Sequence, residues 1–544
     1  MIGLMMDKQL SIPEILEYAA VYNPDGEIVS RTIEGDIHRY NYSDSLLRTR
    51  KLANALLSLD IKKGDRIATL AWNTYRHFEL YYAISGIGAI THTINPRLFA
   101  EQIVYIINHA EDKYIFVDLT FVPLLERVAG ELKGVKGFVI MTDKSHMPKT
   151  TLDHVLCYEE LIAPHSDEYT WPMLDEKTAA GLCYTSGTTG DPKGVLYSHR
   201  STVIHAISSG RAAALNLGPL SRVLPVVPMF HVCAWGIPYS APVAGASIIF
   251  PGAGMDGKSL YDLIETESAT SLLGVPTVWL GLLNYVDSID GNLDGVENVV
   301  IGGSAAPLSM LDKFQDKYGV FPIHAWGMTE MSPMGTLVSK TYPLLDADLE
   351  SRHKIQAKQG RPVFGVEMKI VNDAGVELPH DGKNYGRLLV RGPWVASAYY
   401  KSDEQSAFQK DGWFDTGDVS TIDPEGYMQI VDRSKDVIKS GGEWISSIEL
   451  ENHAVGFEPI AEACVIGVPH PKWDERPLLL VVLKEGESAT REEILEFLES
   501  RVAKWWLPDE VEFVEELPHT ATGKLLKTSL RETYHDHYMT RTSE

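Results

Sequence analysis

Apolar and polar positions alternate along this chain with two different periods. Residues 43–57 carry apolar side chains at the spacing of a helix with one buried face, whereas residues 66–71 and 114–117 are short, mainly apolar runs. Short apolar strands that alternate with amphipathic helices are typical of parallel sheets covered by helices on both faces. We therefore expect an α/β protein with doubly wound sheets.

A charged stretch at residues 432–436 interrupts this pattern directly after a strand-like run at 427–431. Domain boundaries fall in exposed, polar connections of this kind. We expect an N-terminal domain over residues 1–431, a hinge at 432–436 and a small, mobile α+β C-terminal domain over 437–544.

The C-terminal part has the pattern of a small α+β unit. Apolar runs at residues 463–468 and 478–483 predict two strands, and Thr490 with Glu493 has the spacing of a capping box at the start of a helix. That helix would present one apolar face, formed by Ile494, Leu495, Leu498 and Val502.

Residues 223–255 contain no Asp, Glu, Lys or Arg, which raises the question of a membrane span. Five prolines interrupt the stretch, at positions 225, 228, 238, 242 and 251, and a membrane helix does not normally carry so many. We expect core strands and loops around a ligand pocket, and no membrane span.

Composition narrows the class of protein. The 544 residues carry a formal net charge of −25, which argues against nonspecific nucleic-acid binding, since that depends on Lys and Arg next to phosphates. The four cysteines lie far apart without metal-ligand spacing, and the start of the chain lacks the apolar core of a secretory signal. We expect reduced thiols and a cytoplasmic protein.

The strongest chemical signal is residues 184–194, which read Tyr-Thr-Ser-Gly-Thr-Thr-Gly-Asp-Pro-Lys-Gly. The glycines let successive backbone N–H groups point at phosphate oxygens, and hydroxyls and a lysine add further contacts. It is not a Walker A loop, because Gly194 follows Lys193 where that motif needs Ser or Thr. The residues predicted to bind phosphate are Thr185, Ser186, Gly187, Thr188, Thr189, Gly190 and Lys193.

Residues 252–257 match the three-glycine pattern of dinucleotide-binding loops and follow an apolar run. Pro251 stands between the two, however, and no strand-ending acidic residue follows at the distance that this fingerprint requires. We interpret the segment as a turn.

The phosphate-binding segment resembles the signature loop of the adenylate-forming superfamily, which comprises acyl-CoA synthetases, the adenylation domains of peptide synthetases, and luciferases. Further motifs of that family follow in order, so that the resemblance covers nearly the whole chain. It implies a large N-terminal domain of two doubly wound sheets plus a β-barrel, joined to a small C-terminal domain that swings between two catalytic poses.

By this resemblance a glycine-rich turn approaches the adenine, and a second segment lies beside the nucleotide. Thr329 would contact the α-phosphate, and Glu330 with Thr185 would hold Mg²⁺, a hard cation that takes oxygen ligands. The residues implied at the nucleotide are Gly302, Gly303, Ser304, His324, Ala325, Trp326, Gly327 and Met328.

Two further groups complete the implied nucleotide site. Asp418 and Arg433 match the family's ribose contacts, and Lys435 matches its hinge residue. Lys524 matches the catalytic lysine, a hydrated point charge on a flexible stem that can reach a site built by another domain. With Thr329 and Glu330, it makes up the implied catalytic set.

Residues 439–446 and 470–477 resemble the fatty-acyl-CoA synthetase subgroup, which favours free coenzyme A as the thiol acceptor. The implied reaction is attack of a carboxylate on the ATP α-phosphate, followed by displacement of AMP by the thiol. Dimers are common in this subgroup, so a homodimer is the assembly it suggests. Besides Lys435, the resemblance places Lys439, Gly441, Gly442, Glu443 and Trp444 among the cofactor-binding residues.

The identity of the acid depends on His231 and Trp235, which match residues that line the acyl channel of fatty-acyl synthetases. The alternative is that both are core residues. The whole string also resembles bacterial 3-methylmercaptopropionyl-CoA ligases, which favours that small thioether acid. A medium- or long-chain fatty acid is the alternative. Two other classes stay open: a luciferase-like oxygenase and a noncatalytic nucleotide sensor.

Overall fold

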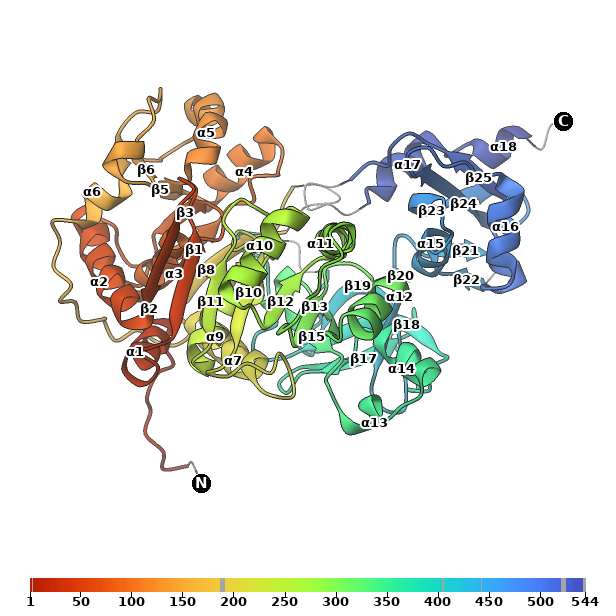
Figure 1. Ribbon diagram of the computed structural model, residues 1–544, viewed down its shortest axis with the longest axis horizontal. Coiled ribbons are helices and arrows are strands. Elements are labelled where there is room, and N and C mark those ends of the chain that lie inside the picture. Colours follow the sequence, from red (N-terminus) through yellow and green to blue (C-terminus); the bar gives the residue numbers. More distant parts are fainter. Residues whose placement is uncertain (2, 186–190, 404–405, 442, 520–524, 542–544) are drawn as a thin grey trace.

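A computed structural model describes residues 1, 3–185, 191–403, 406–441, 443–519 and 525–541. A large N-terminal part contains three sheets, and a smaller part with its own sheet, blue in Figure 1, lies to one side of it. The expected fold class, α/β with a large N-terminal and a separate small C-terminal domain, is confirmed.

The first sheet has seven strands in the order β7-β6-β5-β3-β4-β8-β9, parallel except for the last pair. Helices α2, α3 and α6 pack on one face, and α4 and α5 on the other. The strands are β3 (Arg66–Leu70), β4 (Ile90–Thr93), β5 (Asp112–Val117), β6 (Gly137–Ile140), β7 (Val155–Cys157), β8 (Ala179–Tyr184) and β9 (Gly194–Ser198). The helices are α2 (Tyr42–Ser58), α3 (Tyr75–Gly86), α4 (Ala100–Ala110), α5 (Val122–Val128) and α6 (Tyr158–Ile162).

The second sheet has nine strands in the order β16-β15-β14-β13-β12-β10-β11-β1-β2. They are β1 (Glu27–Arg31), β2 (Ile37–Asn41), β10 (Arg222–Pro225), β11 (Ser247–Phe250), β12 (Ser271–Gly274), β13 (Asn298–Ile301), β14 (Phe321–Gly327), β15 (Met334–Leu337) and β16 (Arg361–Pro362). Its helices are α1 (Ile12–Tyr22), α7 (His199–Gly210), α8 (Val232–Trp235), α9 (Ile237–Ala244), α10 (Gly257–Glu267), α11 (Pro276–Ser288), α12 (Leu308–Asp312), α13 (Tyr342–Leu345) and α14 (Leu349–Gln356). The central strands are parallel, so their carboxyl ends open on one edge, where α/β proteins bind ligands.

The unit expected as a β-barrel is a four-stranded antiparallel sheet in the described residues. Its strands are β17 (Glu367–Val371), β18 (Tyr385–Arg391), β19 (Phe414–Ile422) and β20 (Met428–Arg433). A bridge between Gly360 and Met428 joins β20 to the segment next to β16, so this sheet is fastened to the nine-stranded one.

The C-terminal part is a five-stranded sheet with α15 and α16 on one face and α17 and α18 on the other. Its elements are β21 (Ile438–Ser440), β22 (Glu443–Ile445), α15 (Ser447–Val455), β23 (Ile460–His470), β24 (Asp474–Leu483), α16 (Arg491–Glu499), β25 (Glu510–Phe513), α17 (Lys527–Thr533) and α18 (His537–Arg541). The predicted capping box at Thr490 and Glu493 is confirmed, since each side chain accepts the other's backbone N–H. Of the predicted apolar face, Ile494 and Leu498 are buried, whereas Val502 lies beyond the end of the helix.

The charge-free stretch 223–255 differs in part from the prediction. Strands β10 and β11 lie at its ends as expected, but α9 stands between them where strands and loops were predicted. Pro238 falls in the first turn of α9, where a missing N–H needs no partner, and Pro242 lies inside the short helix. The segment 252–257 is a turn into α10, which Asp256 caps through the backbone N–H of Ser259.

A buried ion-pair network joins α2 to α3 and α6. The fully buried carboxylate of Glu79 accepts from Arg48 Nε at 2.6 Å and from the Tyr158 hydroxyl at 2.6 Å. Arg48 also pairs with Glu159 at 3.0 Å. Each charge therefore has partners, which is the condition for burying it.

Two expectations from composition can be compared with the structure. All four cysteines are free thiols, and Cys183 and Cys233 approach within 3.9 Å without a disulfide. Across the described ranges, none of the helices combines the length and the apolar character needed to cross a bilayer.

Candidate nucleotide and acyl site

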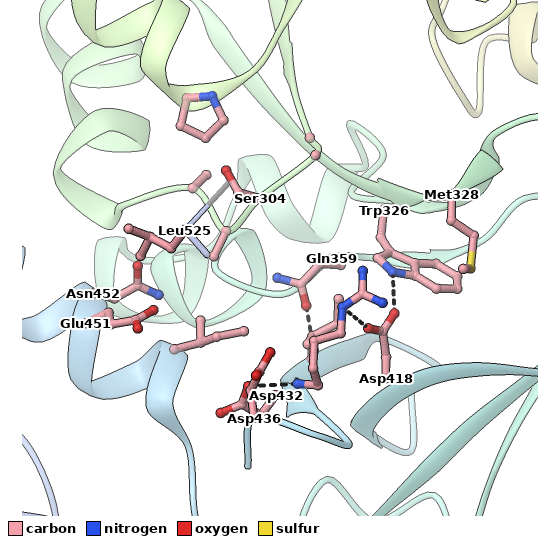
Figure 2. Close-up of a pocket in the computed structure, with 18 of the residues that line it drawn as sticks. Ser304, Trp326, Met328, Gln359, Asp418, Asp432, Asp436, Glu451, Asn452 and Leu525 are labelled. Carbon is pink, nitrogen blue, oxygen red and sulfur yellow. Dashed lines mark hydrogen bonds and ion pairs between the residues drawn. The ribbon is translucent and has the colours of Figure 1, made fainter. Parts of the chain in front are cut away.

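A cavity of about 1550 Å³ opens where the sheets of the N-terminal part meet the C-terminal part. Its walls come from the nine-stranded sheet, from the four-stranded sheet and from the region of α15 and α17. Figure 2 shows Trp326 and Asp418 on one side, with Asp432, Glu451 and Asn452 on another. Predicted site residues that line it are Thr185, Lys193, His231, Trp235, Gly302, Gly303, Ser304, Ala325, Trp326, Gly327, Met328, Thr329, Glu330, Asp418, Arg433 and Lys435.

The predicted phosphate-binding segment connects two antiparallel strands. Tyr184 of β8 is paired with Gly194 of β9, and Thr185 N donates to Lys193 O at 2.9 Å. The Thr185 hydroxyl accepts from Lys193 N at 3.2 Å, so both ends of the segment are fixed. Ser186, Gly187, Thr188, Thr189 and Gly190 lie outside the described residues.

Glu330 sits in a short 3-10 turn after β14 and is only 6% exposed. Its Oε1 accepts from the Tyr399 hydroxyl at 2.7 Å, and the Tyr399 ring lies 5.1 Å from Lys193 Nζ. Burial raises the pKa of Glu330, and the hydrogen bond from Tyr399 opposes that rise. One tyrosine therefore contacts both a carboxylate suited to a metal and a lysine suited to phosphate.

The turn that carries Glu330 is fixed from two other segments. The Tyr197 hydroxyl, from β9 of the seven-stranded sheet, donates to the Thr329 carbonyl at 2.7 Å. The backbone N–H of Ala396 donates to the Glu330 carbonyl at 2.7 Å. These contacts position Thr329 and Glu330 at the junction of the three N-terminal sheets.

Asp418 and Arg433 stand opposite each other on β19 and β20. Their side chains pair at 2.9 Å, and the second carboxylate oxygen of Asp418 accepts from Trp326 Nε1 at 3.0 Å (Figure 2). Asp418 is 1% exposed, so these two bonds fix its orientation toward the cavity. A fixed carboxylate of this kind is suited to accept hydrogen bonds from ribose hydroxyls.

Trp235 packs on a glycine of the opposite wall. A Cβ built on Gly302 would lie 3.1 Å from the Trp235 ring and 3.0 Å from the Ala325 carbonyl. A side chain at position 302 would therefore crowd the indole ring and the Ala325 carbonyl. Trp235 and His231 both line the cavity, and Trp235 also packs against the core.

The segment that carries Trp235 is strained. Val232, Cys233, Ala234 and Trp235 all have φ between 47° and 55°, and Gly236 follows at 81°. Non-glycine residues rarely adopt this left-handed conformation, which costs roughly 1–2 kcal/mol each. Strain of this kind clusters at functional sites.

Several predicted residues lie elsewhere. His324 is a buried residue of β14, where its Nδ1 lies 3.2 Å from the Gln356 carbonyl and burial lowers its pKa to about 4. Lys439 is on β21 and Gly441 is in the turn that follows this strand, and neither residue lines the cavity. Gly442 and Lys524 lie outside the described residues. Glu443 and Trp444 are described only as part of strand β22.

Two functional candidates were not found from the sequence. Tyr399 is 69 positions from Glu330, and no local motif marks it. Gln359 lines the cavity and its Oε1 accepts from Ile430 N at 2.6 Å, which fixes the start of β20. Both are brought to the site only by the packing of the four-stranded sheet against the nine-stranded one.

The oxygen donors fit the implied Mg²⁺. Glu330 offers a buried carboxylate and Thr185 a hydroxyl, and both line the same cavity. Hard oxygen ligands of this type, completed by phosphate oxygens and water, are those that Mg²⁺ prefers.

A solved structure shares this fold, including its large and small parts. The crystal structure of the anthranilate CoA ligase AuaEII in complex with anthranoyl-AMP matches the fold with a TM-score of 0.86, at 24% identity over 97% of this chain and 98% of that one. The protein belongs to the AMP-binding enzyme family, whose model matches residues 16–400, and the model of that family's C-terminal domain matches residues 449–524.

Full-length relatives agree with this assignment. A 3-methylmercaptopropionyl-CoA ligase of Ruegeria lacuscaerulensis is 50% identical over 98% of this chain and 99% of its own length. A medium-chain-fatty-acid–CoA ligase of Ectopseudomonas oleovorans is 49% identical over 98% of each chain. The predicted family and the prediction of an enzyme are confirmed.

Proposed function

We propose that the protein is an AMP-forming acyl-CoA ligase that joins a small carboxylic acid to coenzyme A, with 3-methylmercaptopropionate as the specific acid. The observation that carries the proposal is the cavity itself. Lys193, Glu330 and the Asp418–Arg433 pair all line it, and Trp235 forms part of its wall.

The negative charges of the carboxylate and of ATP determine what the site must do in the proposed reaction. In the first step a carboxylate attacks the α-phosphate of ATP, the bond to pyrophosphate breaks, and an acyl-adenylate forms. Two anions must meet, so Lys193 and Lys524 would neutralise and align them. Mg²⁺, when bound, supplies further positive charge to the phosphate oxygens. In the second step the thiol of coenzyme A attacks the acyl carbon and AMP leaves.

The choice of a small acid depends on Trp235. Its ring lies next to Gly302 in the wall of the cavity. Our proposal is that the ring limits the length of the acyl chain from this position. The relatives do not decide the matter, because the thioether-acid ligase and the medium-chain ligase are almost equally similar to this chain. A medium- or long-chain fatty acid is the second candidate, and it requires Trp235 to swing away.

A chain-length series tests the substrate. We would measure kcat/KM for 3-methylmercaptopropionate and for straight-chain acids from three to sixteen carbons, with ATP, Mg²⁺ and coenzyme A. Each methylene that fits contributes about 0.8 kcal/mol, or roughly fourfold, so the preference should rise and then break where the pocket ends. We expect the break at short-to-medium length. A steady rise to sixteen carbons would favour the fatty-acid ligase.

The variant Trp235→Ala sharpens this test, with Trp235→Phe as the matched control that keeps an aromatic wall. Removing the ring should move the break toward longer acids and weaken the small acid, because the small acid loses contacts. The control should move the break less. An unchanged break in Trp235→Ala would show that another residue forms the far wall.

The other classes are separated by products. Release of pyrophosphate that depends on an added acid distinguishes the ligase from a nucleotide sensor, and thioester formation distinguishes it from an oxygenase. The proposal includes rotation of residues 437–544 about a hinge at Lys435, with Lys524 acting in the adenylating pose. A homodimer and a cytoplasmic location complete it; the free thiols support the latter.

A further inference from the structure

A group of buried charges crosses the proposed hinge, which lies between β20 and β21. Asp432, three positions before the hinge residue Lys435, is 1% exposed. Its Oδ2 accepts from the backbone N–H of Ser447 at 2.7 Å and from the Ser447 hydroxyl at 2.6 Å. Ser447 opens α15 in the C-terminal part, so this carboxylate is bound from the far side of the hinge.

The Ser447 hydroxyl also links Asp432 to a buried lysine. Lys527 Nζ donates to Ser447 Oγ at 2.5 Å and pairs with Glu451 Oε1 at 2.7 Å. Lys527 begins α17, three positions after Lys524, so the helix that follows the catalytic lysine is tied to residue 432. Burial raises the pKa of Asp432, and the charge of Lys527 opposes that rise.

A neighbouring hydrogen bond also crosses the hinge. The Ser446 hydroxyl donates to the Val431 carbonyl. Val431 and Asp432 thus both contact the first residues of α15 across the hinge. In contrast, the bond between Arg531 Nη1 and Asp436 Oδ1, at 2.5 Å, joins two groups that both lie after Lys435.

Rotation about Lys435 separates these two kinds of contact. Pairs that lie on one side, such as Arg531 with Asp436, travel together and survive. The bonds from Ser446 and Ser447 to Val431 and Asp432 join opposite sides and must break. They are therefore specific to the pose that the structure shows.

That pose has the features expected for adenylation. His519 and Leu525, which flank residues 520–524, line the same cavity as Ser304 and Trp326 (Figure 2 labels Leu525). Lys439, from the segment that resembles the fatty-acyl-CoA synthetase subgroup, does not line it. The described residues on both sides of positions 520–524 thus lie at the cavity that holds the predicted nucleotide contacts.

We propose that Asp432 is a positioning residue whose carboxylate, through Ser447 and Lys527, latches the C-terminal domain in the adenylating pose. This inference rests on the proposed function for its two half-reactions. It assigns Asp432 and Ser447 no contact with substrate. They act by setting how much of the protein occupies each pose.

The test is Asp432→Asn, which keeps the size of the side chain and removes its charge. Hydrogen bonds to a buried charged group correspond to about a 10- to 100-fold change in an equilibrium. We expect acid-dependent exchange of pyrophosphate into ATP to fall by roughly 10-fold or more. Thioester formation from presynthesised acyl-adenylate should be unchanged or faster.

Asp436→Asn is the matched control, since it makes the same chemical change four positions along at a contact within one side. It should leave the ratio of the two half-reaction rates at the wild-type value. Ser447→Ala is the second latch variant and should shift the ratio in the same direction as Asp432→Asn. If Asp432→Asn does not fold, Ser447→Ala tests the inference in its place.

A readout independent of turnover is the distance between two dyes, one on each domain. In the latch variants with bound ATP, energy transfer should shift toward the second pose, whereas wild type and control should agree. Wild-type ratios and transfer in both latch variants would overturn the inference. If no acid gives a thioester, the proposed function fails, yet the dye measurement still decides whether the latch exists.

Discussion

The contact between Tyr399 and Glu330 gives the sharpest prediction from the site. Tyr399→Phe removes one hydroxyl and keeps the ring, so the contact of the ring with Lys193 remains. Glu330 is 6% exposed, and it loses a 2.7 Å hydrogen bond to its carboxylate. A bond to a buried charged group contributes about 1.5–3 kcal/mol, which corresponds to roughly 10- to 100-fold in affinity.

The expected defect has a definite dependence on pH. Burial already raises the pKa of Glu330, and the bond from Tyr399 lowers it, so losing that bond raises the pKa further. A carboxylate with a higher pKa is protonated over a wider range as pH falls. The variant should therefore lose most at acidic pH and recover as pH rises, whereas the wild type changes less.

The assay is the concentration of Mg²⁺ that gives half-maximal pyrophosphate exchange, measured from about pH 6 to about pH 9. A second readout is the dissociation constant for Mn²⁺ in the presence of a nonhydrolysable ATP analogue. Tyr400→Phe is the control, because the same hydroxyl is removed one position along, where the backbone N–H bonds to Gly194. A loss that is equal at all pH values, or equal in the control, would refute the role given to this bond.

Three further outcomes are expected. Lys524→Ala should lower adenylation by at least about 100-fold while thioester formation from presynthesised acyl-adenylate survives, and an equal loss in both would remove Lys524 from the adenylating step. Lys435→Pro, which fixes φ, should leave adenylation and abolish transfer to coenzyme A, so normal transfer would place the hinge elsewhere. Glu79→Gln should destabilise the protein by about 3–5 kcal/mol in denaturant unfolding, because it breaks an ion pair at a fully buried carboxylate and leaves the partly buried Arg48 with less compensation; a loss below about 1 kcal/mol would contradict this.

Sequence motifs could predict those candidate site residues that lie within a recognisable local pattern. Asp418 and Arg433 were found in this way, and the structure adds that they face each other across two antiparallel strands. Tyr399 could not be found, because its bond to Glu330 exists only when two sheets pack together. No periodicity or spacing in the chain encodes that packing.

Helix α9 shows a second limit of sequence reasoning. Its prolines favoured strands and loops, yet a proline in the first turn is compatible with a helix. The parallel sheets, in contrast, were predictable. Their strands are short apolar runs such as β3 and β5, whose boundaries agree with the predicted runs to within two residues.

The site draws its side chains from separate sheets, and this has a practical consequence for finding the natural acid. Lys193, Glu330 and Asp418 come from three sheets, so a ligand that binds all three is bound only while those sheets remain assembled. The energy of binding then adds to the stability of the whole N-terminal part, by about 2.7 kcal/mol at a ligand concentration of 100 times its dissociation constant. The melting temperature becomes a gauge of occupancy, and candidate acids can be ranked as adenylate analogues without a single turnover.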